Sequence, residues 1–170
     1  VLRTFGFDEP TGIRGERDGL PEDWRPVRLD RDPMARRRAA NGLGQIETIP
    51  MQVARATIGL ATGLLPELRI VHAVGGEEVE YPAPEALPIG RDALRKVRRA
   101  MEGVAAAPGG TAYHGFNPAV LPWRVAAKTG SADLNSPQPG MPVYKHTWVT
   151  GFLPPENPVC VFTVFLERCE

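Results

Sequence analysis

The chain has 170 residues, of which 42% are hydrophobic and 24% are charged, and this suits one domain with its own core. Lysine and arginine number 20 and aspartate and glutamate also number 20, so the formal net charge is zero. A neutral chain argues against nucleic-acid binding, which needs clustered positive charge. The longest mostly apolar stretch, residues 58–65, is far shorter than the roughly 20 residues that span a bilayer.

The first part of the chain, residues 1–41, is rich in charge, glycine and proline. Turn signals such as Asp18-Gly19 predict a mostly extended loop with little regular structure. The run Arg36-Arg37-Arg38 could bind an anion. Because acidic residues stand nearby, at Asp30 and Asp32, a solvated face is the preferred interpretation.

Residues 42–122 form a mainly helical part, with helices predicted over residues 50–62 and 91–106. Proline suits the first turn of the first helix and Gly63 suits its end. Between the helices, residues 68–74 are predicted as a strand or extended segment that Gly75-Gly76 closes. The second helix has an apolar stripe at helical spacing, with cations outside it, and the stripe consists of Leu94, Val97, Met101 and Val104.

Residues 123–170 are predicted to form antiparallel strands over residues 124–131, 147–152 and 159–167. The last two are joined by a short turn-rich connector and should form a hairpin. The third strand is apolar at nearly every position, which is typical of a strand buried on both faces. Helices followed by such strands predict an α+β fold in which helices flank an antiparallel sheet.

The two cysteines, Cys160 and Cys169, lie at or just beyond the ends of the third predicted strand. At about 3.3 Å per residue a continuous strand separates them by roughly 30 Å, whereas a disulfide needs Cα atoms within about 7 Å. We therefore expect no bridge between them. Neither these cysteines nor the three histidines have the spacing of a metal site.

A lysine, two hydroxyl groups and a glycine meet at the first predicted strand, in Lys128-Thr129-Gly130-Ser131. On a strand, Lys128 and Gly130 face one way and Thr129 and Ser131 the other. A strand edge with a glycine lets an extended peptide approach the backbone, a lysine attracts a carboxylate, and a backbone N–H can stabilise an oxyanion. Taken alone, the tripeptide Lys-Thr-Gly is better interpreted as a strand that ends in an ordinary glycine turn, so the rest of the sequence has to decide.

That context is a set of sequence phrases in a definite order. In chain order they are Phe7-Asp8-Glu9-Pro10-Thr11-Gly12-Ile13, Gly42-Leu43-Gly44, Pro50-Met51-Gln52-Val53-Ala54, Gly110-Thr111-Ala112, Ala127-Lys128-Thr129-Gly130-Ser131-Ala132 and His146-Thr147-Trp148-Val149-Thr150-Gly151-Phe152. With these phrases the chain resembles the C-terminal part of the transpeptidase domain of penicillin-binding proteins, most closely the class B type, within the penicillin-recognising serine acyltransferases. Two positions depart from the family pattern, which has Gln where Leu43 stands and Thr where Ile49 stands before the helix.

The family's nucleophile belongs to a Ser-x-x-Lys motif and its second motif is Ser-x-Asn. The chain has two serines, Ser131 and Ser136, and neither matches these motifs. Family order places both motifs upstream of Val1. We therefore interpret residues 1–170 as about the last half of one transpeptidase domain, and we expect this half to be inactive by itself.

The resemblance also implies roles for the site residues. Lys128 would set the electrostatics and proton traffic around the nucleophile. The hydroxyls of Thr129 and Ser131 would bind a carboxylate of the substrate or of a β-lactam, with Gly130 leaving room for it. The backbone N–H of Ser131 would form half of an oxyanion hole. Trp148 is interpreted as packing rather than as a substrate contact.

The implied function is that of a peptidoglycan D,D-transpeptidase, which cross-links stem peptides ending in D-Ala-D-Ala through a serine acyl-enzyme. The expected partners are that peptide, β-lactams and the upstream half of the domain, with no cofactor, metal or nucleic acid. The expected location is extracytoplasmic, with any membrane anchor outside this chain. A β-lactam sensor or inactive homologue, and a β-lactamase-like hydrolase, remain as alternatives.

Overall fold

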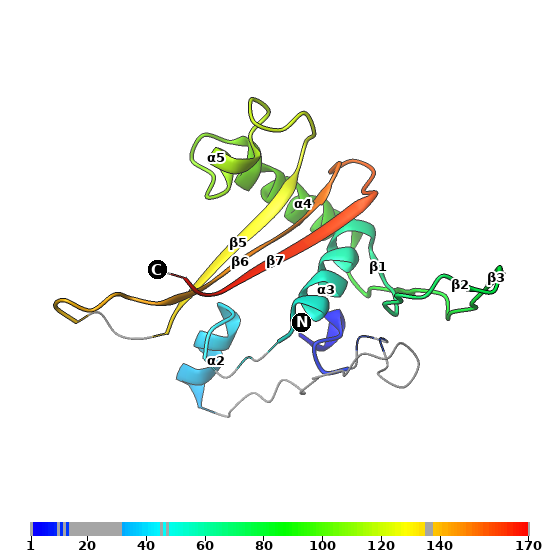
Figure 1. Cartoon of the computed structure of the whole chain (residues 1–170), viewed down its shortest axis with the longest axis horizontal. Helices are drawn as coiled ribbons and strands as arrows, with labels where there is room; N and C mark the ends of the chain where they lie inside the picture. The colour runs from blue at the N-terminus through cyan, green and yellow to red at the C-terminus, as the bar shows by residue number, and fades with distance from the viewer. Residues whose placement is uncertain are drawn as a thin grey trace. The chain divides into compact units, whose positions relative to one another are not determined.

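The computed structural model describes residues 2–9, 11, 13, 32–44, 46, 48–134 and 138–169. The chain divides into two compact units, one from residues 1–59 and 64–88 and the other from residues 60–63 and 89–170. The second unit contains three long strands that lie side by side in Figure 1, and these strands carry the predicted site.

The first unit contains most of helix α3 (Pro50–Thr62), together with the single turn η1 (Arg3–Phe5) and helix α2 (Pro33–Ala40). Four two-residue strands complete it, and they pair antiparallel as β1 (Leu64–Leu65) with β4 (Glu85–Ala86) and β2 (Ala73–Val74) with β3 (Glu77–Glu78). The part predicted as mainly helical thus also holds these short strands.

Helix α3 has the bounds that the sequence predicts, Pro50–Thr62, and Gly63 follows it with a positive φ of 83°. Ile49 has no side-chain group that could cap the helix. Instead, the Gln52 side chain reaches back, and its Oε1 accepts from the Ile49 backbone N at 3.4 Å and from Thr48 Oγ1 at 3.1 Å. This is the returning half of a capping box, and it replaces part of what a threonine cap supplies.

Helix α2 corrects the prediction of an extended loop over residues 1–41, which is wrong for Pro33–Ala40. The helix begins because Asp32 is an N-cap, its Oδ2 accepting from the Ala35 backbone N at 2.8 Å, and because proline fits the first helical turn. Alanine and arginine then continue it as good helix formers. The turn signals at Asp18-Gly19 lie outside the described residues.

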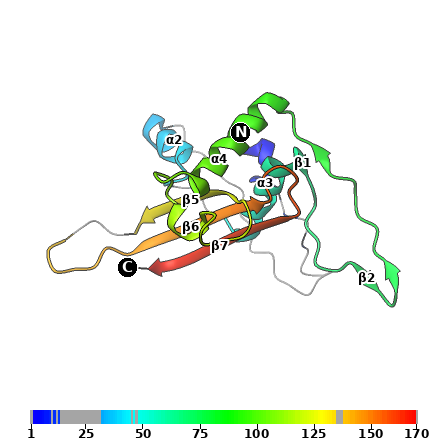
Figure 2. The same ribbon diagram turned by 90° about the horizontal axis from the view of Figure 1, so that it is seen from above.

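Of the segment predicted over residues 68–74 as a strand or extended, only Ala73–Val74 is a strand, and the residues before it are not helical. Gly75 and Gly76 close the tight turn to β3 with φ of 62° and 92°, a conformation that favours glycine at both positions. Figure 2 shows β2 near the end of a long arm. Beyond β2 and β3 the two sides of the arm are joined by other contacts, such as Val79 N donating to His72 O at 3.0 Å and Tyr81 OH donating to Val71 O at 3.0 Å.

The second unit has the α+β architecture that the sequence predicts. Helix α4 has the predicted bounds, Arg91–Ala106, and packs against strand β5 (Ala126–Asp133). The short helix α5 (Tyr113–Phe116) follows α4. Strands β6 (Lys145–Leu153) and β7 (Cys160–Cys169) complete an antiparallel sheet in the order β5-β6-β7, so the predicted hairpin and neighbouring strands are confirmed within a few residues at each end.

The core of the second unit lies on both faces of this sheet at the beginning of β5. Ala126 and Ala127 are successive residues that point to opposite faces, and both are completely buried. Ala126 packs with Ala61, Met101 and Phe152, whereas Ala127 packs with Ala105, Ala112 and Val125. Packing on both faces anchors this end of β5.

Strand β7 is less buried than its apolar sequence predicts. Val161 and Phe162, near its start, pack against the two clusters, but Val164 and Leu166 are 48% and 54% exposed. The prediction of a strand buried on both faces is therefore wrong. Among the described strands β7 pairs only with β6, and helix α4 packs chiefly on β5, which leaves the later part of β7 more open. Its first and last residues, Cys160 and Cys169, are free thiols.

Candidate active site

The predicted site residues lie inside strand β5, which continues to Asp133, two residues beyond the predicted end. β5 pairs with β6 on one side, and within the described part of the chain no strand pairs with its other side. Lys128 and Ser131 are exposed, and Thr129 and Gly130 are half-buried. The four residues therefore form part of an open strand edge.

The β5–β6 register shows which backbone groups face that edge. Leu134 N donates to Tyr144 O at 2.8 Å, which continues the ladder that pairs Asp133 with Lys145. In an antiparallel ladder, residues that exchange hydrogen bonds with the neighbouring strand alternate with residues that do not. Leu134 belongs to the first set, so Thr129 and Ser131 belong to the second, and their backbone N–H and C=O point away from β6. In keeping with this direction, the Lys128 ammonium donates to the carbonyl oxygen of Thr129.

The side chains of the tetrapeptide divide between the two faces of the sheet, as the strand periodicity predicts. Lys128 lies opposite Thr150 and Gly130 lies opposite Trp148. Thr129 and Ser131 are on the other face, opposite Val149 and Thr147. The backbone edge, a cation and two hydroxyls are thus presented from consecutive residues.

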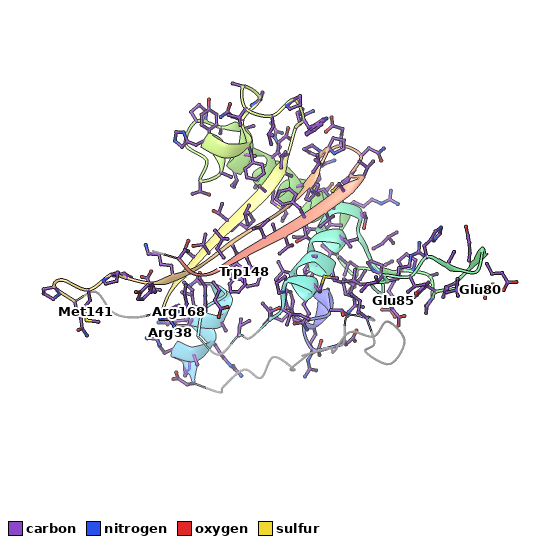
Figure 3. All side chains as sticks on the ribbon, in the orientation of Figure 1. Arg38, Glu80, Glu85, Met141, Trp148 and Arg168 are labelled. Atoms are coloured by element: carbon purple, nitrogen blue, oxygen red, sulfur yellow. The ribbon has the colours of Figure 1, made fainter. Side chains whose placement is uncertain are left out.

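Gly130 is not required by the packing of the sheet itself. A Cβ atom at this position would lie 3.7 Å from the Cβ of Trp148, an ordinary van der Waals contact, and no atom of another described residue lies closer. Trp148, which Figure 3 labels on β6, packs with its ring centroid 4.2 Å from that of Phe165 on β7. The interpretation of Trp148 as a packing residue fits this contact, and the space beside Gly130 is left to whatever approaches the strand.

Thr111 is a residue whose part in the site the sequence does not reveal. Its Oγ1 lies 2.6 Å from Thr129 Oγ1, so the two hydroxyls share a hydrogen bond although 18 positions separate them. Gly110-Thr111-Ala112 is one of the phrases that resemble the family, but nothing in the sequence indicates that Thr111 reaches the β5 hydroxyl. The contact depends on how the α4–α5 connection folds back onto the sheet.

An ion-pair cluster lies just before the beginning of β5. Arg124 Nη1 lies 3.1 Å from Glu156 Oε1 in the β6–β7 connection, and Arg124 also pairs with Glu102 of α4, its Nε donating at 3.0 Å. The hydrogen bond to Glu102, the charge of Glu102 and the charge of Glu156 raise the pKa of Arg124 above its usual value. The arginine thus links a helix, a strand and a turn at the base of the strand that carries the site.

Among the described residues the structure shows neither a metal site nor a membrane-spanning helix. No three His, Cys, Asp or Glu side chains among them gather as metal ligands. No helix in the described ranges is long and apolar enough to cross a membrane. Ser136, the second serine, is outside the part of the chain that the structure describes.

Comparison with known proteins gives a family match over the whole chain. The family described as the penicillin binding protein transpeptidase domain matches residues 1–170. The chain is similar to peptidoglycan D,D-transpeptidase MrdA of Haemophilus influenzae. The two are 29% identical over an alignment of 188 positions, which covers 98% of this chain and 29% of that protein. MrdA of Salmonella typhimurium is 30% identical over 191 residues, covering 99% of this chain and 30% of that protein.

Solved structures agree with this match. The complex between penicillin-binding protein PBP2 and MreC from Helicobacter pylori has a TM-score of 0.70 and 26% identity, covering 98% of this chain and 31% of that one. A peptidoglycan synthetase from Bifidobacterium adolescentis has a TM-score of 0.73 at 24% identity, covering 99% of this chain and 31% of that one, and supports the fold. The chain therefore spans 29% to 31% of the length of these relatives.

Proposed function

The chain belongs to the family of penicillin-binding protein transpeptidase domains, and on that premise we propose that it is the C-terminal part of a peptidoglycan D,D-transpeptidase. The observation that carries the proposal is the open outer edge of β5, where Lys128, Thr129 and the backbone of Ser131 are presented together. Such an edge suits an extended peptide that ends in a carboxylate.

The nucleophile in this proposal is a serine outside residues 1–170, because neither Ser131 nor Ser136 is followed by lysine three positions later. Its oxygen bonds to the carbonyl carbon of the penultimate D-Ala. The amide bond to the terminal D-Ala breaks, and that nitrogen takes a proton and leaves with free D-Ala. The amine of a second stem peptide then attacks the ester, forming the cross-linking amide, and the serine oxygen recovers a proton.

The strand residues assist this chemistry without forming covalent bonds to the substrate. The Thr129 hydroxyl donates to the terminal carboxylate, and the Ser131 hydroxyl is a second donor to it. The outward-directed N–H of Ser131 stabilises the oxyanion that forms at the attacked carbonyl. Lys128, whose ammonium lies at the same edge, raises the local positive potential for the substrate carboxylate and takes part in proton transfer at the nucleophile.

β-Lactams are proposed to bind at the same edge, because their carboxylate takes the place of the peptide terminus and their ring amide the place of the scissile bond. The reaction needs no metal or organic cofactor. Because peptidoglycan lies outside the cytoplasmic membrane, the site is proposed to work on that side. A sensor would also be acylated but would not form cross-links, and a hydrolase would release the acyl group to water. The reaction products therefore distinguish a transpeptidase from a sensor and from a hydrolase.

The test is product analysis with the complete protein of which this chain is a part. The protein is incubated with a stem peptide ending in D-Ala-D-Ala and an acceptor stem peptide with a free amine, and products are read by mass spectrometry. We expect a cross-linked dimer with release of one D-Ala. We also expect Lys128→Ala to lower the initial rate by roughly a hundredfold or more, the size of effect that removal of one electrostatic group from an active site produces.

The matched control is Lys96→Ala, since Lys96 is exposed on α4, outside the site. It should leave the rate within about twofold, as surface substitutions away from functional features usually do. A product that has only lost D-Ala would point to a hydrolase, and penicillin labelling without any peptide product would point to a sensor. Equal rates for the Lys128→Ala and Lys96→Ala proteins would remove the assignment of Lys128.

A further inference from the structure

We propose that Thr111 is a positioning residue for carboxylate recognition, which donates its hydroxyl proton to Thr129 and so directs the Thr129 proton to the carboxylate of the ligand. The inference rests on the proposed function of Thr129. It starts from the 2.6 Å separation of the two Oγ1 atoms, which join the α4–α5 connection to strand β5.

Thr111 is held in place by the residues on either side of it. A Cβ atom on Gly110 would lie 2.2 Å from the carbonyl oxygen of Val104, so only glycine lets the chain pass this close to the end of α4. Ala112 is 6% exposed, and its backbone N donates to Val104 O at 3.1 Å. Because both neighbours are fixed against α4, Thr111 is presented at one position instead of being left on a freely moving loop.

The hydrogen bond between the hydroxyls is not needed to satisfy buried polar atoms. Thr111 is exposed and Thr129 is half-buried, so water can reach the pair. Polar groups without access to water must find partners in the protein, but these two are under no such requirement. A short side-chain bond at the exposed edge therefore calls for an explanation other than burial.

The chemistry of a carboxylate decides the direction of this bond. A threonine hydroxyl has one proton to donate and two lone pairs that accept, and an ionised carboxylate only accepts. When Thr129 donates to a carboxylate, its single proton is used, so the bond to Thr111 requires Thr111 to donate. The order Thr111 to Thr129 to carboxylate fixes the rotation of the Thr129 hydroxyl, and each bond polarises the next.

The test compares penicillin G with its methyl ester as acylating agents of the complete protein, because the ester lacks the ionised carboxylate. The readout is the ratio of the two second-order acylation rates, acid over ester. We expect Thr111→Val to lower this ratio by about twofold to tenfold, the range that loss of one neutral hydrogen bond produces. Thr111→Ser keeps a donor and should restore the ratio.

Two further variants complete the design. Thr129→Val should lower the ratio more, and adding Thr111→Val to it should lower it no further, because Thr111 acts through Thr129. Thermal unfolding is recorded for each protein, and Thr111→Ala replaces Thr111→Val if the latter does not fold.

The acid and ester rates distinguish a positioning role of Thr111 from a purely structural one. Equal losses for acid and ester in Thr111→Val would assign Thr111 a structural role only and overturn the inference. An effect of Thr129→Val without one of Thr111→Val would also overturn it while leaving the proposed function intact. Absence of acylation of the unsubstituted protein by either compound would instead contradict the proposed function, and the inference with it.

Discussion

Thr129 has one hydroxyl, which in this structure already shares a hydrogen bond with Thr111. If that hydroxyl also donates to the substrate carboxylate, Thr129→Val removes one hydrogen bond to a charged group at almost constant side-chain shape. Such a bond contributes about 1.5–3 kcal/mol. We therefore expect a tenfold to hundredfold lower second-order rate of penicillin acylation, roughly a factor of ten for each 1.4 kcal/mol.

The measurement is the time course of acylation of the complete protein by a fluorescent penicillin, with the thermal midpoint of unfolding recorded alongside. Thr163→Val is the matched control, because it also removes a threonine hydroxyl from the sheet, one that shares a 2.8 Å hydrogen bond with Thr150. The control should keep its acylation rate. If the rate for Thr129→Val is also unchanged within about twofold, Lys128-Thr129-Gly130-Ser131 would be an ordinary strand segment without a role in carboxylate binding.

At the residue scale, the sequence predicts on which face of a strand each side chain lies, because that depends on local periodicity. It does not predict contacts between residues that are far apart in the sequence, because these depend on how the chain folds. The alternation of Lys128 and Gly130 against Thr129 and Ser131 follows from strand geometry and is found in the structure. The partner of Thr129 could not be predicted in this way. Thr111 is separated from β5 by a short helix and the turns around it, and only the packing of the α4–α5 connection brings it to the strand.

At the scale of elements, the connection between α4 and α5 determines where Thr111 lies, and Gly110 is its critical residue. We expect Gly110→Ala to lower the free energy of unfolding by about 1–3 kcal/mol, the usual effect of forcing a methyl group into a packed region. The new Cβ would lie 2.2 Å from the backbone carbonyl oxygen of Val104 on α4. A backbone atom cannot turn aside as a side chain can, so the connection itself would have to shift.

Gly109→Ala is the matched control for this substitution. Among the residues that the structure describes, none has an atom within 4 Å of a Cβ placed on Gly109, and the φ of Gly109 is not in the left-handed region. Its free energy of unfolding should stay the same or rise by about 0.4–1 kcal/mol, because alanine restricts the unfolded chain. Denaturant unfolding of both variants of the complete protein checks this pair. Equal stabilities would show that the connection adapts, and Gly110 would then not fix Thr111.

The elements that the sequence predicts well are those with a clear local signal. Helix α3 has recognisable ends and helix α4 has an apolar stripe, and both have the predicted bounds. Helix α2 escapes prediction because its mostly charged and small residues give no apolar stripe, although Asp32 and Pro33 mark its start. The burial of β7 is overestimated because an apolar strand sequence does not specify which neighbours cover it.

At the scale of the whole molecule, the chain spans 29% to 31% of the length of its relatives and contains one side of the proposed site. The sequence predicts that the nucleophile lies outside this chain, since the 170 residues contain the Lys-Thr-Gly phrase and no Ser-x-x-Lys motif. Local sequence pattern does not reveal where the proposed nucleophile lies relative to the edge of β5.

The proposed function is tested most directly by locating the acyl group after penicillin treatment. The complete protein is incubated with penicillin, digested, and searched by mass spectrometry for the peptide that carries the penicilloyl adduct; the 170-residue chain alone is treated in parallel. We predict an adduct on a serine of a Ser-x-x-Lys motif outside residues 1–170, and no adduct on the chain alone. An adduct on Ser131 or Ser136, in either sample, would contradict the proposal that the nucleophile lies outside this chain.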